Sequence, residues 1–237
     1  MSVYTPHFAP IVVLAFLGTT LLAILSVFVG LLGALRKSRR MATGGMAAGV
    51  VLMLVYGSIL LAFSFLSRDV VLLPGAWKYF CEIDCHIAYS VGRVQTIESA
   101  TAELEGGPRS EQFAIIELKT WFDPSTISPH RGNGPLMPSE RRIRLIDSGG
   151  HEHSESPQKE SLLAAKGLHS TPLRTRLRPG ESYVSYLVFQ TPVEGKDFRV
   201  LVTSAEELDR ALWGHEISPY HGKAYFQISD AQVHGSR

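Results

Sequence analysis

Two apolar stretches on either side of a basic turn decide the fold of this chain: FAPIVVLAFLGTTLLAILSVFVGLLGAL at residues 8–35, RKSRR at 36–40 and MATGGMAAGVVLMLVYGSILLAFSFLS at 41–67. Neither apolar stretch contains a charged residue. The hydrocarbon core of a bilayer is roughly 30 Å thick, and about 20 helical residues span it. Each stretch is long enough to cross with some tilt. The sequence therefore predicts a transmembrane helical hairpin, residues 1–67, with spans at about 8–35 and 43–66.

The basic turn predicts how the hairpin is oriented. Its four cationic residues are Arg36, Lys37, Arg39 and Arg40, whereas the tail at 1–7 has no Lys or Arg. Short loops rich in Lys and Arg stay in the cytoplasm. We therefore expect the N-terminus and everything after the second span to lie outside the cytoplasm. A cleaved signal peptide would need a basic N-terminal region and a shorter apolar core, and neither is present.

The composition also predicts the type of membrane. The chain is rich in Ala, Gly and Arg and contains a single Asn, Asn133, which lies in no glycosylation sequon. This usage is typical of a bacterium with a GC-rich genome. We expect the bacterial inner membrane, with the C-terminal domain in the periplasm.

Gly45 and Gly49 form a small-xxx-small pair near the start of the second span. Such a pair lets two helix backbones approach closely. Two interpretations are open: the two spans pack on each other, or this face docks on another membrane protein. No ionisable residue lies within either predicted span, so the sequence gives no sign of an ion or proton path.

The rest of the chain has the size of one domain. We expect a juxtamembrane linker at 68–77 and an extracytoplasmic domain at 78–237. This part contains all 22 acidic residues and, because four of the 23 Lys and Arg residues lie in the turn, the other 19, which gives a net charge near −3. That balance disfavours nucleic-acid binding, which needs a basic surface.

Short stretches of strand character, separated by Gly, Pro and Asp, predict an all-β domain. The stretch Lys78–Val91 alternates with a period of two, with Tyr79, the two cysteines and Ile87 on its apolar face. Further strands are predicted at Gln112–Phe122, Arg141–Asp147, Ser182–Gln190, Asp197–Thr203 and Lys223–Ser229, with another possible at Val94–Ala102. Many short strands without alternating helices indicate an antiparallel, immunoglobulin-like sandwich.

Two helical elements are predicted in this domain. Ser204–Glu207 reads as a capping box that starts a helix ending at Gly214. The polar loops at 123–140 and 148–176 are long, and the second is expected to hold a helical turn at Lys159–Ala165. Loops of this length in a compact domain are often functional.

The run Leu177–Tyr183, then Leu187–Pro192 and Phe198–Val202, resembles the C-terminal half of a bacterial family of extracytoplasmic, telokin-like immunoglobulin-fold domains. Phe113–Phe122 and Ile143–Gly150 are similar to the earlier strands of that family. The resemblance covers most of residues 78–229. It implies the fold and an extracytoplasmic location, but no chemistry, because the family is largely of unknown function.

The sequence Cys81-Glu-Ile-Asp-Cys85-His86 has four interpretations. On a regular strand, residues four apart lie about 13 Å from each other, whereas a disulfide needs Cα atoms within about 7 Å. A Cys81–Cys85 disulfide would therefore require a sharp bend. The other three interpretations are two buried thiols, haem attachment through a motif one residue longer than Cys-x-x-Cys-His, and a copper or zinc site with His86.

Cytochrome oxidase subunit II also has two membrane helices before an external β-domain, but its copper motif lies near the end of the domain and includes a nearby Met. The topology is similar, and the motif does not carry over. Other His residues, in His151-x-His153, His215-Glu216 and His221, are expected to be solvated or locally hydrogen-bonded. Trp77 lies close enough to the second span to be an aromatic residue of the membrane interface.

The sequence as a whole predicts a non-enzymatic, membrane-anchored β-sandwich without a cofactor. We expect it to bind or brace a partner protein as an accessory or scaffold subunit of a membrane assembly. The alternative is a redox or metal-carrying subunit that uses Cys81, Cys85 and His86 to hold copper, zinc or haem.

Overall fold

The computed structural model describes residues 3–4, 9–80, 86–98, 112–128, 130–191 and 197–228. The chain divides into two compact units, which are described separately. The β-domain comprises Met1–Thr5, Asp69–Ala205 and Lys223–Arg237. The hairpin unit comprises Pro6–Arg68 together with Glu206–Gly222, which we name the return segment.

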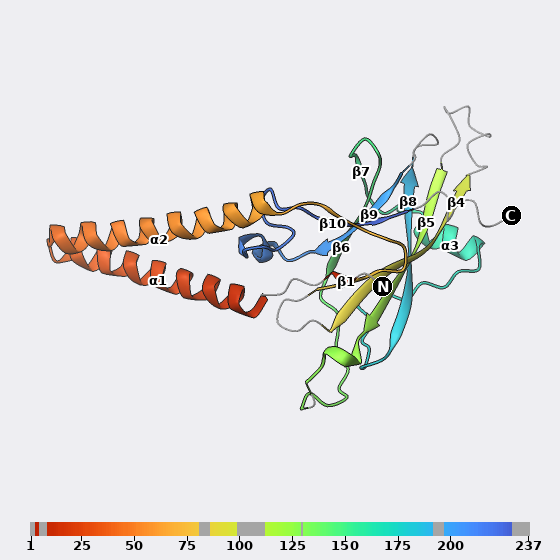
Figure 1. Cartoon of the computed structure of the whole chain (residues 1–237), viewed down its shortest axis with the longest axis horizontal. Helices are drawn as coiled ribbons and strands as arrows, with labels where there is room; N and C mark the ends of the chain where they lie inside the picture. Colours follow the sequence, from red (N-terminus) through yellow and green to blue (C-terminus); the bar gives the residue numbers. More distant parts are fainter. Residues whose placement is uncertain are drawn as a thin grey trace. The chain divides into compact units, whose positions relative to one another are not determined.

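The hairpin unit is built on two long helices, α1 (Ala9–Leu35) and α2 (Arg39–Leu66). Both are long and apolar enough to cross a membrane, by length and composition. The turn between them is shorter than predicted, because Arg39 and Arg40 already belong to the first turn of α2. Lys37 adopts a left-handed φ of 55° there, and the N–H of Ser38 returns to the carbonyl of Gly33. Figure 1 shows the helices meeting at this turn, with the dark blue return segment beside the far end of α2.

The described residues of the β-domain form two sheets of five strands each. The first, sheet A, has the order β1 (Val3–Tyr4), β3 (Trp77–Tyr79), β4 (Ile87–Glu98), β5 (Gln112–Phe122) and β8 (Ser182–Thr191). The second, sheet B, has the order β2 (Val70–Leu72), β10 (Ala224–Gln227), β9 (Arg199–Ser204), β6 (Arg141–Ile146) and β7 (Glu152–His153). Most neighbours are antiparallel, but β1 pairs with β3, and β2 with β10, in parallel.

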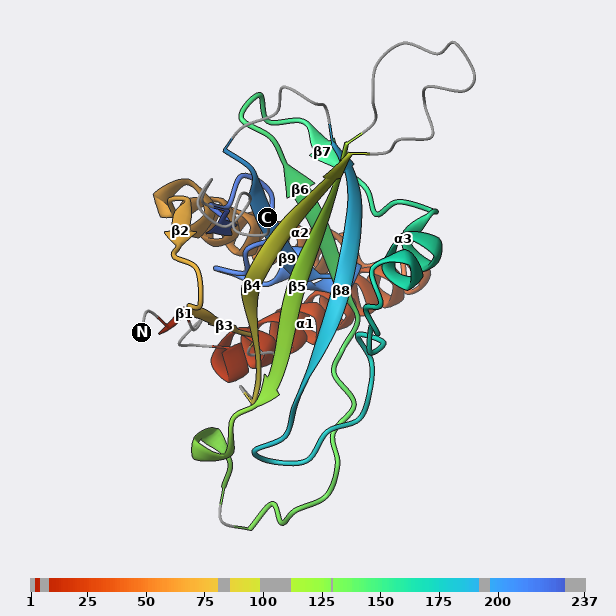
Figure 2. The same cartoon turned by 90° about the vertical axis from the view of Figure 1, so that its right-hand side faces the viewer.

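A buried apolar core lies between the two sheets. It includes Tyr89, Ile116 and Leu118 from sheet A, and Leu145, Val200 and Phe226 from sheet B. The domain is therefore sandwich-like, as predicted. The one α-helix of its described part, α3 (Lys159–Ala165), agrees with the predicted helical turn. It packs Leu163 against Phe113, Ile115 and Val188 on the outer face of sheet A, beside β8 (Figure 2).

The prediction of one continuous strand from Lys78 to Val91 is wrong. Lys78 pairs with Tyr89 and Tyr79 with Ala88 in an antiparallel register, so the chain reverses direction between β3 and β4. The prediction that Tyr79 lies on the core-facing side of this stretch is also wrong, since Lys78 and Phe80 point into the core. A Cys81–Cys85 disulfide therefore stays one of the open interpretations. Both cysteines lie outside the described residues.

The helix predicted to start at Ser204 and end at Gly214 is shorter in the structure and of another type. Ser204 is the last residue of β9, where it pairs with Arg141, and its side chain is buried. The element that follows is a 3₁₀ helix, η3 (Glu207–Ala211), whose N-cap residue Glu206 makes no side-chain capping bond. The predicted linker at 68–77 also differs, because Val70–Leu72 forms strand β2 of sheet B. In both places the chain pairs within sheet B with a strand that is distant in the sequence.

Candidate functional site at the open end of the hairpin

The return segment is a chain of tight turns that connects β9 to β10. After η3, successive backbone N–H groups bond to the carbonyl three residues earlier: Leu212 to Asp209, His215 to Leu212, Ser218 to His215 and His221 to Ser218. The Ser218 hydroxyl also donates to the Leu212 carbonyl at 2.6 Å. These local bonds satisfy the backbone without a sheet or a regular helix, so the segment has a defined shape.

Tyr56 anchors the middle of the return segment to α2. Its hydroxyl donates to the carbonyl of Ala211 at 2.6 Å, and its ring lies 4.9 Å from that of Trp213. On its other side the Tyr56 ring lies 6.2 Å from that of Phe16 in α1. Tyr56 is 9% exposed. One buried tyrosine thus joins both helices and the return segment through rings of a type that pair favourably.

A second set of contacts fixes the end of the return segment. The rings of Phe65 and Tyr220 stack with centroids 5.4 Å apart. The N–H of Gly222 donates to the Ser67 hydroxyl at 2.7 Å. A Cβ at Gly222 would lie 2.3 Å from the Arg68 carbonyl carbon, so only glycine permits this approach of the two backbones. The return segment is held at two levels of α2 that are nine residues apart.

The return segment is polar despite these aromatic contacts. It carries seven acidic or basic residues: Glu206, Glu207, Asp209, Arg210, His215, Glu216 and His221. The imidazole of His215 lies 3.6 Å from the Asp209 carboxylate, both largely buried, and Arg210 pairs with Glu207 at 2.8 Å on the surface. Ionised groups are costly in hydrocarbon, so these residues limit how deep the segment can lie in a bilayer.

At the closed end of the hairpin, glycines bring the two helices into backbone contact. A Cβ at Gly45 would lie 2.5 Å from the Gly30 nitrogen and 2.8 Å from the Ser26 carbonyl oxygen. A Cβ at Gly33 would lie 2.4 Å from the Ala42 nitrogen. At Gly49 the nearest atom would be the Ser26 Cβ at 3.6 Å, an ordinary contact. The pair quoted in the sequence therefore faces α1, with a close approach at Gly45 only.

The structure places His86 in a buried polar network at the turn end of β4. Its Nδ1 lies 2.9 Å from the Thr126 hydroxyl, which itself donates to the Asp123 carbonyl, so Nδ1 carries the proton in this bond. Asp123 accepts the Tyr79 hydroxyl at 2.5 Å and two bonds from Ser125. His86 thus connects the start of β4 to the turn that follows β5.

The electrostatics of this network follow from burial and hydrogen bonding. Burial raises the pKa of Asp123, but hydrogen bonds from Tyr79 and Ser125 outweigh it and hold that pKa below its ordinary value. Burial, together with the neighbouring carboxylate, raises the pKa of Tyr79 above its ordinary value. The pair is an uncharged hydroxyl donating to an ionised carboxylate at neutral pH.

The structure places Trp77 in sheet A, with 9% of its surface exposed. Its ring packs 5.1 Å from that of Trp121, and the Lys119 ammonium lies 5.7 Å from its centroid. Little of the ring is left to contact lipid. The role of Trp77 as a membrane-interface anchor stays a prediction. The sequence analysis did not identify Tyr56, whose ring contacts Trp213 in the structure.

His151 and His153 converge on one carboxylate in the β6–β7 turn. His153 Nε2 lies 3.0 Å from Asp147 Oδ2 and His151 Nδ1 lies 3.3 Å from it. The backbone N–H of His151, and the His153 ring, hold the pKa of Asp147 at about 2. Across the ranges that the structure describes, no group of three or more His, Cys, Asp or Glu could hold a metal ion.

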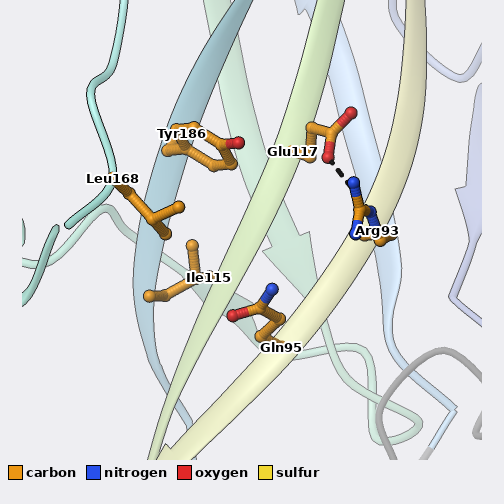
Figure 3. A pocket seen from close by; sticks show the side chains of 6 residues that line it. All are labelled: Arg93, Gln95, Ile115, Glu117, Leu168 and Tyr186. Atoms are coloured by element: carbon orange, nitrogen blue, oxygen red, sulfur yellow. Dashed lines mark ion pairs between the residues drawn. The ribbon is translucent and has the colours of Figure 1, made fainter. Parts of the chain in front are cut away.

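A small cavity of about 100 Å³ lies on the outer face of sheet A (Figure 3). A β-bulge at Gly92 and Arg93 opposes Glu117 and turns the Arg93 side chain onto this face, where it pairs with Glu117 at 3.7 Å. Gln95, Ile115, Leu168 and Tyr186 complete the lining. The Arg93 side chain is largely solvent-exposed, so the ion pair is weak.

Comparisons with known proteins leave the family of this chain open. No family model matches it, and no curated protein matches it. Among solved structures, it is similar to the crystal structure of a conserved hypothetical protein from Bacillus anthracis, with 16% identity and a TM-score of 0.34, over 49% of this chain and 82% of that one.

Proposed function

We propose that this chain is a non-enzymatic, membrane-anchored β-sandwich that binds or braces a partner membrane protein, as an accessory subunit in the bacterial inner membrane. The hairpin crosses the bilayer, the basic turn stays in the cytoplasm, and the β-domain lies in the periplasm. The basic turn supports the orientation.

The position of the bilayer follows from two sets of residues. Arg39 and the other turn residues set the inner boundary. Tyr56 lies 17 residues after Arg39, which is about 26 Å of helix, and Phe16 lies 19 residues before Leu35, about 28 Å. Both distances approach the thickness of the hydrocarbon core, roughly 30 Å. The charged return segment, which contacts Tyr56, therefore marks the outer boundary of the hydrocarbon.

The observation that carries the proposal is the apolar surface beyond this boundary. About ten residues of α2, from 57 to 66, extend past Tyr56, which is about 15 Å of helix. This outer end keeps Phe63 53%, Phe65 68% and Leu66 83% exposed, and the facing end of α1 exposes Ile11 at 66%. Exposed apolar side chains at the level of polar headgroups and water are a typical mark of a protein interface.

The proposal is tested by releasing the protein from native membranes with a mild detergent and separating the particles by native electrophoresis with mass spectrometry. We expect a particle larger than the chain with one stoichiometric partner. Phe63→Gln should release the chain from that particle. Met137→Gln, at an exposed apolar residue of the β-domain, is the matched control and should leave the particle intact. Wild-type protein released as a monomer would contradict the proposal.

The redox or metal-carrying alternative is tested on the same preparation. Its cysteines lie outside the described residues, and His86 is engaged with Thr126. Stoichiometric copper, zinc or iron, or a visible absorption band that disappears in the Cys81→Ser/Cys85→Ser variant, would favour this alternative over the scaffold function.

A further inference from the structure

We propose that the start of the return segment, η3 with Trp213, lies in the headgroup layer of the outer leaflet and binds phospholipid, as a third membrane-contacting element. The proposal rests on the proposed function only for the placement of the hairpin in the bilayer. It does not depend on a protein partner. The partner of this surface is the lipid interface, where acyl chains meet headgroups.

Depth is the first argument. The carbonyl of Ala211 and the ring of Trp213 both contact Tyr56, so they lie at its level, about one hydrocarbon thickness from the basic turn. Leu208 is three residues before Ala211 in the same 3₁₀ helix, so it lies within about 6 Å of that level.

Surface chemistry is the second argument. Leu208 is 72% exposed, although it is apolar and belongs to a short turn held firmly on α2. Arg210 and Glu207 of the same turn form an exposed ion pair. An apolar side chain beside a zwitterionic pair matches the lipid interface, where a leucine reaches the acyl chains and the charges meet the headgroups.

The return segment also supplies a matched control. Tyr220 is 75% exposed, like Leu208, but it stacks on Phe65, nine residues further along α2 than Tyr56. Nine residues correspond to about 14 Å of helix. The headgroup region adds only about 5–8 Å to each side of the hydrocarbon. Tyr220 should therefore lie outside the lipid, in the same segment and at the same exposure.

The test uses tryptophan fluorescence of the full chain in phosphatidylcholine vesicles whose acyl chains are brominated either near the headgroup or near the methyl end. In a Trp213→Phe background, a single reporter is introduced as Leu208→Trp, Tyr220→Trp or Val50→Trp. The parent signal from Trp77 and Trp121 is subtracted. Val50 is 56% exposed and lies well inside the part of α2 between Arg39 and Tyr56, so it reports whether the hairpin is in the bilayer.

We expect the deep bromines to quench the reporter at 50, the shallow bromines to quench the reporter at 208, and neither to quench the reporter at 220. No quenching at 208 together with quenching at 50 would overturn the lipid contact and leave the hairpin placement standing. No quenching at 50 would overturn the placement and the lipid contact with it. If the reporter variants do not fold, the difference between wild type and Trp213→Phe decides: shallow quenching of Trp213 supports the proposal, and its absence refutes it.

Discussion

Replacing Gly45 with alanine should separate the two helices of the hairpin. The added Cβ would lie 2.5 Å from the Gly30 nitrogen and 2.8 Å from both the Gly30 Cα and the Ser26 oxygen. Ordinary contacts begin at 3.4 Å. The obstructing atoms belong to the backbone of α1, so no side chain can rotate away. The helices must move apart by about 1 Å, and overpacking of this kind costs about 1–3 kcal/mol.

Gly44→Ala is the matched control, because nothing lies within 4 Å of a Cβ at that position. Both substitutions replace glycine with alanine in the first half of α2, so the gain in helix propensity, about 1 kcal/mol, is common to the two. Their difference in unfolding free energy therefore isolates the helix contact. We expect Gly45→Ala to be less stable than Gly44→Ala by about 2 kcal/mol.

The assay is unfolding of the full-length protein in mixed detergent micelles with increasing dodecyl sulfate, followed by circular dichroism. Gly49→Ala is informative as a third variant, since its nearest neighbour would lie at 3.6 Å and the substitution should be tolerated. Equal unfolding free energies for Gly45→Ala and Gly44→Ala would refute the close approach at Gly45. Equal losses at Gly45 and Gly49 would show that the pair acts as a motif.

Three further predictions concern the β-domain and the return segment. Lys78 is fully buried and donates to the Val202 and Ala224 carbonyls of the opposite sheet. Lys78→Ala should cost about 2–4 kcal/mol through the cavity it leaves, and the volume-conserving Lys78→Met should cost clearly less; equal losses in urea unfolding would contradict this. Because the pKa of Asp147 is depressed to about 2, its stabilising contribution is present above pH 4 and is lost as pH falls from about 4 to 2. Asp147→Asn should flatten acid unfolding in that interval, and an unchanged pH profile would argue against the interaction. Tyr56→Phe removes one hydrogen bond, worth about 1 kcal/mol, so amide exchange in the return segment should accelerate while exchange in the β-domain stays the same.

Much of the fold could be predicted because its signals are local. Hydropathy and the basic cluster located both helices, and alternation located β5 (Gln112–Phe122) with the bounds it has in the structure. The reversal between β3 and β4 was missed because the alternation continues through it and no Gly or Pro interrupts Lys78–Val91. The helix predicted from Ser204 was placed too early, because Ser204 ends β9 through its pairing with Arg141 and the 3₁₀ helix begins at Glu207.

The candidate site could not be predicted from the sequence. Its central bond joins Tyr56 to Ala211, which are 155 residues apart. No periodicity connects them, and the return segment has the composition of an ordinary polar loop. The signal that remained was Tyr56 itself, a hydroxyl within an apolar span, where a buried polar group needs a partner. Gly222 could not be identified from the sequence either, because the need for glycine there comes from the backbone of Arg68, which lies beside it only in the folded chain.

The parallel pairing of β2 with β10 determines when this protein can mature during translation. Val70 pairs with Ala224, 154 residues later. At about 5–20 residues per second, a ribosome needs about 8–30 s to make the intervening chain. Both hairpin helices are already synthesised when β2 emerges, so sheet B closes last. Until β10 is synthesised, β2 lacks its partner strand, and a chain truncated before residue 224 keeps that edge open for aggregation or capture by chaperones.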